Sequence, residues 1–309
     1  MIQDLTRRRF MATGTAGLAA FALPTTQLLA SARDIGAGRL YSFSDGMMTL
    51  PVEMLFANAP PLELAAILAE TGGETGVMRR PVNVNLLEMA DRKILFDAGS
   101  GTNFLSTLGE LPAALDAAGV DIGEITDVVF THAHPDHIWG ILDDFDDLLM
   151  PDAIYHISQD EWAFWDSDRA LAAMPAGREN FAVGAKARFD KIREQTSLFA
   201  PGDALLDGIE VVDAAGHTPG HAAFLVHDPK GSVLIAGDAL THPLISFRHP
   251  DWVNESDMDG AKAARTRKRL LDRLAIDKIE LAATHLPSPG FGRVETHNSS
   301  WRYVPTTHS

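Results

Sequence analysis

The sequence predicts a domain of mixed α and β structure in which helices cover sheets. Short apolar runs that end in turns are spaced along the chain, and segments with helical periodicity lie between them. The composition agrees, because 46% of the 309 residues are apolar and 22% are charged, as in ordinary globular proteins. Strands mixed with helices throughout a chain indicate an α/β or an α+β domain.

The predicted strands are short runs of β-branched and apolar residues. They are residues 82–88, 93–96, 126–130, 209–212, 232–236 and 279–283. Glycine, aspartate and proline follow these runs, as expected where buried strands end in turns. No internal repeat, low-complexity segment or long linker separates them, so residues 33–309 are predicted to form a single domain.

Three segments have the apolar spacing of helices. Residues 111–118 place apolar side chains on one face and end before Gly119, a stop signal. A second helix is predicted to start at Ser158, because Glu161 stands three residues on in the pattern of a capping box. Residues 261–274 are basic on one side and carry leucines on the other.

The charge and the absence of cysteine narrow the range of functions. A formal net charge of −16 argues against nucleic acids and anionic membrane surfaces as partners, since both are polyanions. Without cysteine the chain has no disulfide and no thiolate nucleophile. Any metal site must therefore be built from histidines and carboxylates.

The first 32 residues have the parts of a bacterial export signal. Three arginines and Phe10 precede a weakly hydrophobic run, and residues 30–32 are a small-residue cleavage site. The arginines resemble a twin-arginine (Tat) signal, which implies that the Tat translocase exports the folded protein to the periplasm. The apolar run is too short for a stable membrane anchor, although a short anchor or a disordered basic tail are the alternatives. Cleavage after Ala32 would remove three arginines and one aspartate, which leaves a net charge of −18.

Four potential metal ligands stand within six residues. They are His132, His134, Asp136 and His137, directly after a predicted strand. Alternate residues of an extended segment point the same way, so the first two histidines can share one cation. Pro135 turns the chain, which lets Asp136 and His137 face a second cation nearby.

Three further residues of ligand type follow predicted strands downstream, namely His217, Asp238 and His285. Two neighbouring cations need an anion between them, and Asp238 with a bridging hydroxide would supply it. A lone histidine is usually a core or surface residue. Seven ligand-type residues at strand ends are much harder to explain in that way.

These residues resemble the motif series of the metallo-β-lactamase superfamily. The series is Leu95-Phe-Asp-Ala-Gly99, Thr131-His-Ala-His-Pro-Asp-His137, Gly216-His-Thr-Pro-Gly-His221, Gly237-Asp238 and Thr284-His285. The motifs occur in order over roughly two thirds of the chain. The resemblance implies an α+β fold, the αββα four-layer sandwich, with two metals at one edge of its two sheets.

The resemblance also assigns roles to single residues. The first cation would be held by His132, His134 and His217, and the second by Asp136, His137 and His285, with Asp238 as the bridge. Asp97 would orient a ligand histidine, and His221 is expected to support the site without binding metal. Zinc suits such nitrogen and oxygen ligands, although manganese, iron or cobalt would also fit.

A narrower resemblance covers nearly the whole mature chain. Residues 43–52, 161–165, 284–292 and 301–305 are similar to the methyl parathion hydrolase branch. Exported members of that branch hydrolyse organophosphate triesters and aryl esters, and relatives open N-acyl homoserine lactones. Trp139 stands where a second glycine is common, which would narrow the pocket. Trp165 and Phe181 are the other candidates for the pocket lining, and Trp165 could equally belong to the core.

The sequence thus predicts an exported hydrolase that cleaves a small-molecule ester, lactone or organophosphate triester. Two divalent cations would lower the pKa of a bound water, so that hydroxide attacks the carbonyl or phosphoryl centre. Asp136 would move a proton to the leaving group. The alternatives are a β-lactamase, a glyoxalase-II-like thioesterase, and a metal-dependent binding or sensing protein without turnover. Asp238 counts against a β-lactamase, and export counts against a cytosolic thioester.

Several other conspicuous residues are predicted to have surface or structural roles. They include the histidines outside the motif series, namely His156, His227, His242, His249, His297 and His308. The acidic run 143–147 is expected to be a solvated loop, since it lacks the pattern of a calcium-binding loop. The apolar segments around Met48 and Phe56 are candidates for a contact between two copies of the chain.

Overall fold

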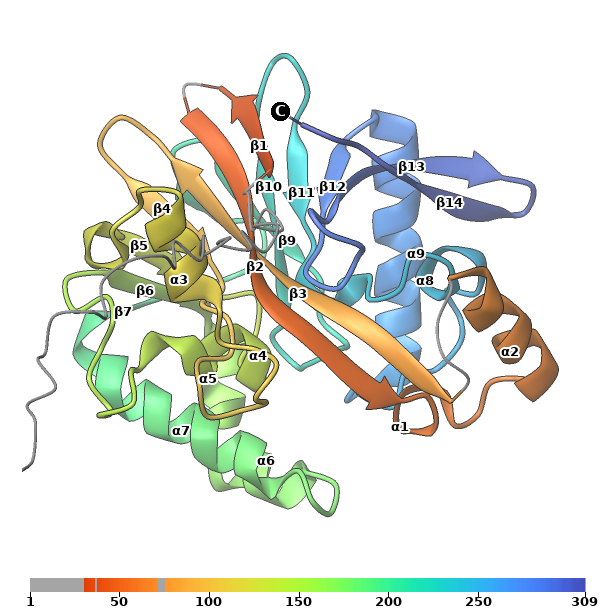
Figure 1. The fold of residues 1–309 in the computed structure, drawn as a ribbon, viewed down its shortest axis with the longest axis horizontal. Helices are drawn as coiled ribbons and strands as arrows, with labels where there is room; N and C mark the ends of the chain where they lie inside the picture. Colours follow the sequence, from red (N-terminus) through yellow and green to blue (C-terminus); the bar gives the residue numbers. More distant parts are fainter. Residues whose placement is uncertain (1–30, 37, 72–75, 309) are drawn as a thin grey trace, which may run out of the picture.

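The computed structural model describes residues 31–36, 38–71 and 76–308, and two seven-stranded sheets make up its centre (Figure 1). The first sheet contains, in spatial order, β1 (Ser31–Ile35), β2 (Gly38–Pro51), β3 (Val77–Glu88), β4 (Lys93–Phe96), β5 (Asp127–Val129), β6 (Ile154–Ser158) and β7 (Thr196–Phe199). The second contains β14 (Ser300–Pro305), β13 (Phe291–His297), β12 (Glu280–Ala282), β11 (Val233–Ile235), β10 (Ala222–Val226), β9 (Ile209–Asp213) and β8 (Ala204–Leu206).

Strand direction decides which loops meet at the edge of the sheets. Strands β4, β5, β6 and β7 are parallel neighbours in the first sheet, and β11 and β12 are parallel in the second. The remaining pairs are antiparallel. Because the carboxyl ends of parallel strands emerge at the same edge, the segments after β4 and β5 lie together, as do those after β11 and β12.

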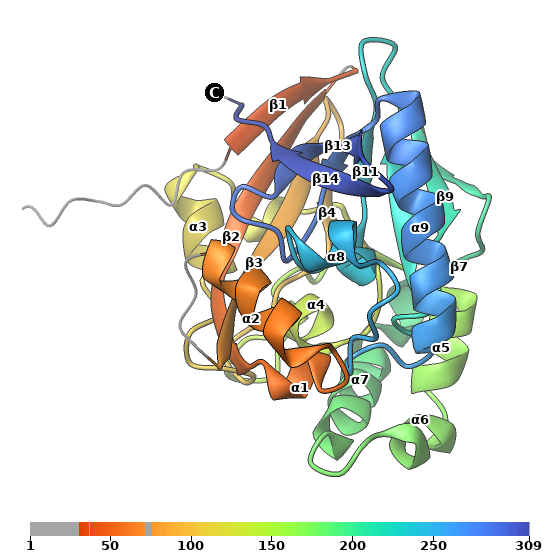
Figure 2. The ribbon, with the colours of Figure 1, turned by 90° about the vertical axis from the view of Figure 1, so that its right-hand side faces the viewer.

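Helices cover the outer face of each sheet, which completes four layers. The first sheet packs against α3 (Leu111–Ala117), α5 (Gln159–Trp165) and α7 (Glu179–Ile192), and the second against α9 (Gly260–Asp277). Figure 2 shows α9 lying along the second sheet. Between the sheets, Phe96 and Phe224 pack with their ring centroids 5.6 Å apart in an apolar core. The predicted αββα sandwich is confirmed.

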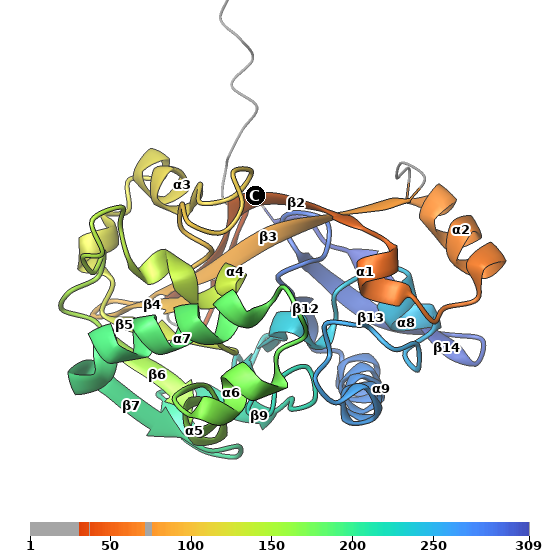
Figure 3. The ribbon, with the colours of Figure 1, turned by 90° about the horizontal axis from the view of Figure 1, so that it is seen from below.

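A small helical unit extends beyond the far ends of β2 and β3. It consists of α1 (Glu53–Phe56) and α2 (Pro61–Glu70), and α8 (Ile245–Arg248) packs beside it (Figure 3). Met48, Leu55 and Phe56 are buried within the chain's own fold. A contact between two copies through the segments around Met48 and Phe56 stays a prediction.

Most predicted elements are confirmed, with ends shifted by a few residues. Strand β3 starts five residues before the predicted run, and α9 extends past both predicted ends. The capping box at α5 is wrong. Ser158 makes no side-chain cap hydrogen bond, and Glu161 turns into the interior instead.

The predicted export signal lies almost entirely outside the described residues, since residues 1–30 are not among them. Ser31 and Ala32 belong to β1 and pair with Ser42 and Tyr41 of β2. In the described part of the chain, none of the helices combines the length and apolar character needed to cross a membrane.

Candidate metal centre

All seven predicted ligands meet at the edge where the two sheets present their loops. His132 and His134 lie in the extended segment after β5, and α4 (Pro135–Ile138) then carries Asp136 and His137. Pro135 occupies the first turn of this short helix, where its missing N–H costs nothing. The sequence prediction that proline turns the chain at this point agrees with the structure.

Asp238 follows β11 in a tight turn that requires glycine. Gly237 has a φ of +50°, and a Cβ there would lie 2.8 Å from His221 Nε2 and from the side chain of Thr131. The backbone N–H of Asp238 donates a hydrogen bond to His221 Nε2 at 3.0 Å. His221 therefore lies behind the centre and holds Asp238, and it contributes no atom to the ligand groups.

The first ligand group consists of three histidines, His132, His134 and His217. His134 Nδ1 lies 3.0 Å from His132 Nε2 and 3.0 Å from His217 Nε2. All three side chains are buried or nearly so. Three imidazole nitrogens that converge on one point can supply three of the ligands of a tetrahedral divalent cation.

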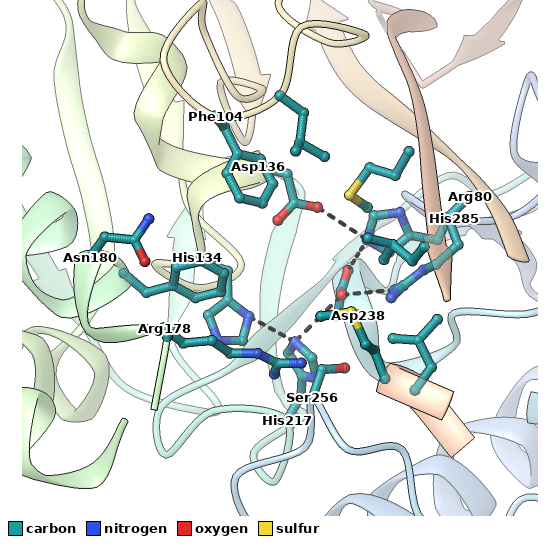
Figure 4. Close-up of a pocket in the computed structure, with 17 residues that line it drawn as sticks. Arg80, Phe104, His134, Asp136, Arg178, Asn180, His217, Asp238, Ser256 and His285 are labelled. Atoms are coloured by element: carbon teal, nitrogen blue, oxygen red, sulfur yellow. Dashed lines mark hydrogen bonds and ion pairs between the residues drawn. The ribbon is translucent and has the colours of Figure 1, made fainter. Parts of the chain in front are cut away.

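The second group combines carboxylates with histidines. Asp136 Oδ2 lies 3.4 Å from His137 Nε2 and 3.3 Å from His285 Nε2. Asp238 Oδ1 lies 3.2 Å from each of these two nitrogens, while Asp238 Oδ2 lies 3.4 Å from His217 Nε2. Asp238 thus presents one oxygen to each group, as Figure 4 shows where it stands between His217 and His285.

These spacings fit cations better than hydrogen bonds. His137 Nε2, His285 Nε2 and Asp238 Oδ1 are buried and have no hydrogen-bond partner among the described residues. Four ligand atoms at 2.0–2.2 Å around a tetrahedral cation lie about 3.3–3.6 Å from one another. The distances of 3.2–3.4 Å in the second group agree with that value. The cluster is a divalent-metal site.

Hydrogen bonds on the far side of the histidine rings fix their orientation. His137 Nδ1 donates to Asp97 at 2.8 Å, which is the orienting role predicted for this aspartate. His217 Nδ1 donates to Asp257 at 2.9 Å, and Arg267 binds the other oxygen of that carboxylate at 3.1 Å. His285 Nδ1 donates to a backbone carbonyl, Pro81 O, at 2.8 Å. Such partners set the tautomer and leave the opposite nitrogen free for metal.

The two groups differ in charge. Burial lowers the pKa of His132 and His134, and the neighbouring histidines lower it further, so both rings are neutral. Burial also disfavours charge in the second group, but there the carboxylates outweigh it and raise the pKa of His137 and His285. In return, the histidines hold the pKa of Asp136 well below its usual range. The second group thus favours positive charge at its centre.

A cavity of about 360 Å³ opens onto both groups. Its polar lining includes Arg80, Arg178, Asn180 and Ser256 besides the ligands. The rest of its wall is apolar and consists of Met48, Leu50, Met54, Leu55, Phe104, Leu105 and Phe181. Ligand pockets of this size, apolar with a few polar groups, are typical of small-molecule sites.

Only one of the three predicted aromatic lining residues reaches this cavity. Phe181 lines it, with its ring 5.9 Å from that of His134. Trp165 is fully buried behind His134, and Trp139 packs under the guanidinium of Arg188 instead of facing the cavity. Neither tryptophan is among the residues that line the cavity, because the core behind the site takes up their large rings. For Trp165 this is the core role that the sequence left equally open.

Four residues of the site were missed by the sequence analysis, namely Arg80, Glu161, Arg178 and Asp257. Arg80 is buried on β3 with Nη2 3.4 Å from Asp238, and Asp257 holds His217. Arg80, Arg178 and Asp257 stand in no local motif, and Glu161 was predicted only as part of a capping box. Contacts between distant segments bring all four to the site, so spacing along the chain did not predict their roles there.

The comparisons with known proteins agree with this geometry. The model of the metallo-β-lactamase superfamily matches residues 77–285, which is more than half of the chain. The chain belongs to the metallo-β-lactamase superfamily. That stretch starts at β3 and ends on His285, so it spans all seven predicted ligands.

Two curated relatives match this chain over only part of their own length. A hydroxyacylglutathione hydrolase of Fuscovulum blasticum is 27% identical over 48% of this chain and 46% of its own. A probable metallo-hydrolase of Mycobacterium bovis is 27% identical over 60% of this chain and 65% of its own. The chain therefore spans less than two thirds of the length of either relative.

Solved structures match over much more of the chain. AidC, described as a dizinc quorum-quenching lactonase in complex with a product N-hexanoyl-L-homoserine, is 26% identical with a TM-score of 0.85. The match covers 92% of this chain and 100% of that protein. The hydrolase AbOPH is 25% identical with a TM-score of 0.84, over 91% of this chain and 98% of its own. These likenesses confirm the predicted superfamily and its lactonase neighbours.

Proposed function

We propose that this chain is an exported dizinc hydrolase that opens lactones or simple esters with an apolar acyl group. The observation that carries the proposal is the cavity, in which the metal ligands face a wall built from leucine, methionine and phenylalanine side chains. An acyl chain buries apolar surface against such a wall, and its reacting carbonyl then lies over the ligands. The likeness to AidC supports the same substrate class.

When bound, the two cations would supply a low-pKa water and polarise the scissile carbonyl. The residues of the chain have separate tasks. Asp136 lines the cavity beside the other ligands, so its carboxylate could pass a proton from the attacking water to the leaving alkoxide. Asn180 and Ser256 offer polar groups that can orient an amide or a ring oxygen.

The cavity fits a glutathione thioester less well than a lactone, and an organophosphate triester is the second candidate. A glutathione thioester, suggested by the hydroxyacylglutathione hydrolase, has a long polar peptide with charged ends, whereas most of the wall here is apolar. An organophosphate triester is compact and apolar, so it remains the second candidate. For the neutral triester, the cavity supplies the same apolar wall and the same metal ligands.

The proposal is tested by metal analysis of the purified protein together with a substrate screen. The panel contains short- and long-chain N-acyl homoserine lactones, p-nitrophenyl esters, a paraoxon-type triester, a β-lactam and S-lactoylglutathione. We expect the largest kcat/KM with a long-chain lactone. A preference for the β-lactam or the thioester would contradict the substrate class, and a zinc-loaded protein inert on the whole panel would favour a binding or sensing role.

Export is a separate part of the proposal and rests on residues 1–32. Fractionation of cells that express the full chain should find it in the periplasm. Replacing Arg8 and Arg9 by lysine should hold it in the cytoplasm, because the signal receptor reads the arginine pair. A protein that stays cytoplasmic with its native signal would contradict export and leave the metal centre unaffected.

A further inference from the structure

Glu161 of α5 carries a fully buried carboxylate that no step of the proposed function uses. Its Oε1 accepts hydrogen bonds from Ala133 N at 3.0 Å and Trp165 Nε1 at 2.7 Å. Its Oε2 accepts from Thr218 Oγ1 at 2.8 Å and Gly220 N at 2.9 Å. Glutamate is rarely fully buried unless it is paired, and here four donors satisfy the carboxylate.

The two oxygens of this carboxylate bind two different ligand loops. Ala133 stands between His132 and His134, and Thr218 directly follows His217. His134 and His217 are 83 residues apart in sequence, yet their ligand nitrogens lie 3.0 Å from each other. Glu161 is thus a direct link between the two segments that build the first group.

The ring of His134 is held less firmly by hydrogen bonds than the rings of the other ligand histidines. Its ligand atom is Nδ1, and within the described residues no hydrogen bond to its Nε2 is found. Ring packing holds it instead, with Trp165 at 5.7 Å and Phe181 at 5.9 Å between ring centroids. Glu161 binds both the Trp165 indole and the backbone beside His134, so it fixes this ring indirectly.

The contact is also close and chemically selective. A Cβ on Gly220 would lie 2.1 Å from the backbone nitrogen of Glu161, so only glycine lets the loop approach α5 this closely. Three of the four partners are N–H groups, which can only donate, and the Thr218 hydroxyl donates here as well. An amide at this position would set its own NH2 against at least one of those N–H groups.

We propose that Glu161 is a positioning residue for the first group. Its carboxylate sets the separation of the His134 and His217 loops, and thereby the affinity of that group for its cation. The inference rests on the proposed two-cation centre. Partners that orient metal ligands typically change metal affinity by about 10–100-fold when they are removed.

The test is zinc titration of the full-length purified protein against a competing chelator. In Glu161→Gln, we expect one of the two zinc affinities to fall by about 10–100-fold and the other to stay unchanged. The Co²⁺ absorption spectrum of the half-loaded variant should match that of His217→Ala, which keeps the second group, and differ from that of His285→Ala.

Asp127→Asn is the matched control. Asp127 is an equally buried carboxylate that binds His156 and Arg92, at the start of β5 and away from the ligand loops. This variant should lose thermal stability and keep both zinc affinities. If Glu161→Gln behaves in the same way, Glu161 only stabilises the fold and the inference is wrong.

A milder variant keeps the test decisive if Glu161→Gln does not fold. Thr218→Val removes one of the four donors and should weaken the same zinc site by a smaller factor. Unchanged zinc affinities in that variant would also overturn the inference. Wild-type protein that binds fewer than two zinc ions would contradict the proposed function instead, so the two failures are distinguishable.

Discussion

The two ligand groups lie side by side and are equally buried, yet their ionisation differs. In the first group, burial and neighbouring imidazoles keep His132 and His134 neutral. In the second, Asp136 and the carboxylates beside it raise the pKa of His137 and His285. Because all four histidines are buried, the difference between the groups comes from their carboxylate neighbours.

The two ligand groups should also differ in how tightly they bind a cation. The second group contributes negative charge from Asp136 as well as from Asp238, so a divalent cation gains more Coulomb energy there. The first group shares only Asp238 and depends on the geometry of three neutral rings. We therefore expect the second group to hold its cation more tightly, and a chelator to empty the first group sooner.

Removing Asp238, which both ligand groups share, should abolish the difference in metal affinity between them. In Asp238→Ala, both groups lose an oxygen ligand, and three buried nitrogens, Nε2 of His137, His217 and His285, lose the carboxylate that lies between them. We expect loss of both metals and a fall in kcat/KM of at least about 10³-fold. Metal analysis and steady-state kinetics check this. A variant that keeps two metals would show that Asp238 is not the bridge.

Asp97→Asn and Asp257→Asn form a pair that separates the groups. Asp97 holds His137 of the second group, and Asp257 holds His217 of the first. Each substitution should weaken zinc binding by about 10–100-fold in its own group alone. Zinc titration with a competing chelator distinguishes the two affinities. If both variants weaken the same site, the assignment of ligands to two groups is wrong.

A change in the cavity wall should leave both groups as they are. Leu105→Ala removes apolar surface from the wall, and we expect about a tenfold lower kcat/KM for a long-chain lactone. A short-chain lactone and both zinc affinities should be almost unaffected. Equal losses on short and long chains would indicate that Leu105 does not contact the acyl group.

His242 is a buried histidine outside the metal centre, and its pKa is also lowered by burial. Burial lowers its pKa to about 3, with Arg80 and Arg248 lowering it further, and its Nδ1 accepts from two backbone N–H groups at the start of α8. Below its ordinary pKa of 6.5, the unfolded chain binds a proton that the folded chain does not. Stability contributed by this residue is therefore lost as the pH falls from about 6.5 toward about 3.

His242→Asn keeps an acceptor for those N–H groups and removes the titration. The variant should lose less stability on acidification, by up to about 1.4 kcal/mol per pH unit in that range. Urea unfolding at neutral pH and at moderately acid pH measures the difference. An identical pH dependence in variant and wild type would contradict the assigned cause.

The ligands were predictable because their signals are local, whereas the four-layer sandwich was implied by the resemblance of the motif series to the superfamily. His132, His134, Asp136 and His137 are neighbours in sequence, and a strand followed by a turn can be read from a few residues. The more distant ligands follow strands too, and parallel pairing of β11 with β12 brings Asp238 and His285 to one edge. For this reason all seven predicted ligands meet in the structure.

The supporting residues could not be predicted in the same way. Glu161 fits a capping box by local spacing, but four donors from distant segments draw its carboxylate into the interior. Asp257 and Arg80 stand in no motif, and only tertiary packing brings them to the ligands. For Trp165 the sequence left core and pocket lining equally open, because an aromatic side chain has no pattern that separates the two.

The most direct test of a two-cation centre is the zinc content of the purified protein and of two single variants. We expect two zinc ions per wild-type chain and one in each of His217→Ala and His285→Ala, with catalysis lost in both. One zinc ion in the wild type, or full activity in a variant that has lost its metal, would contradict it.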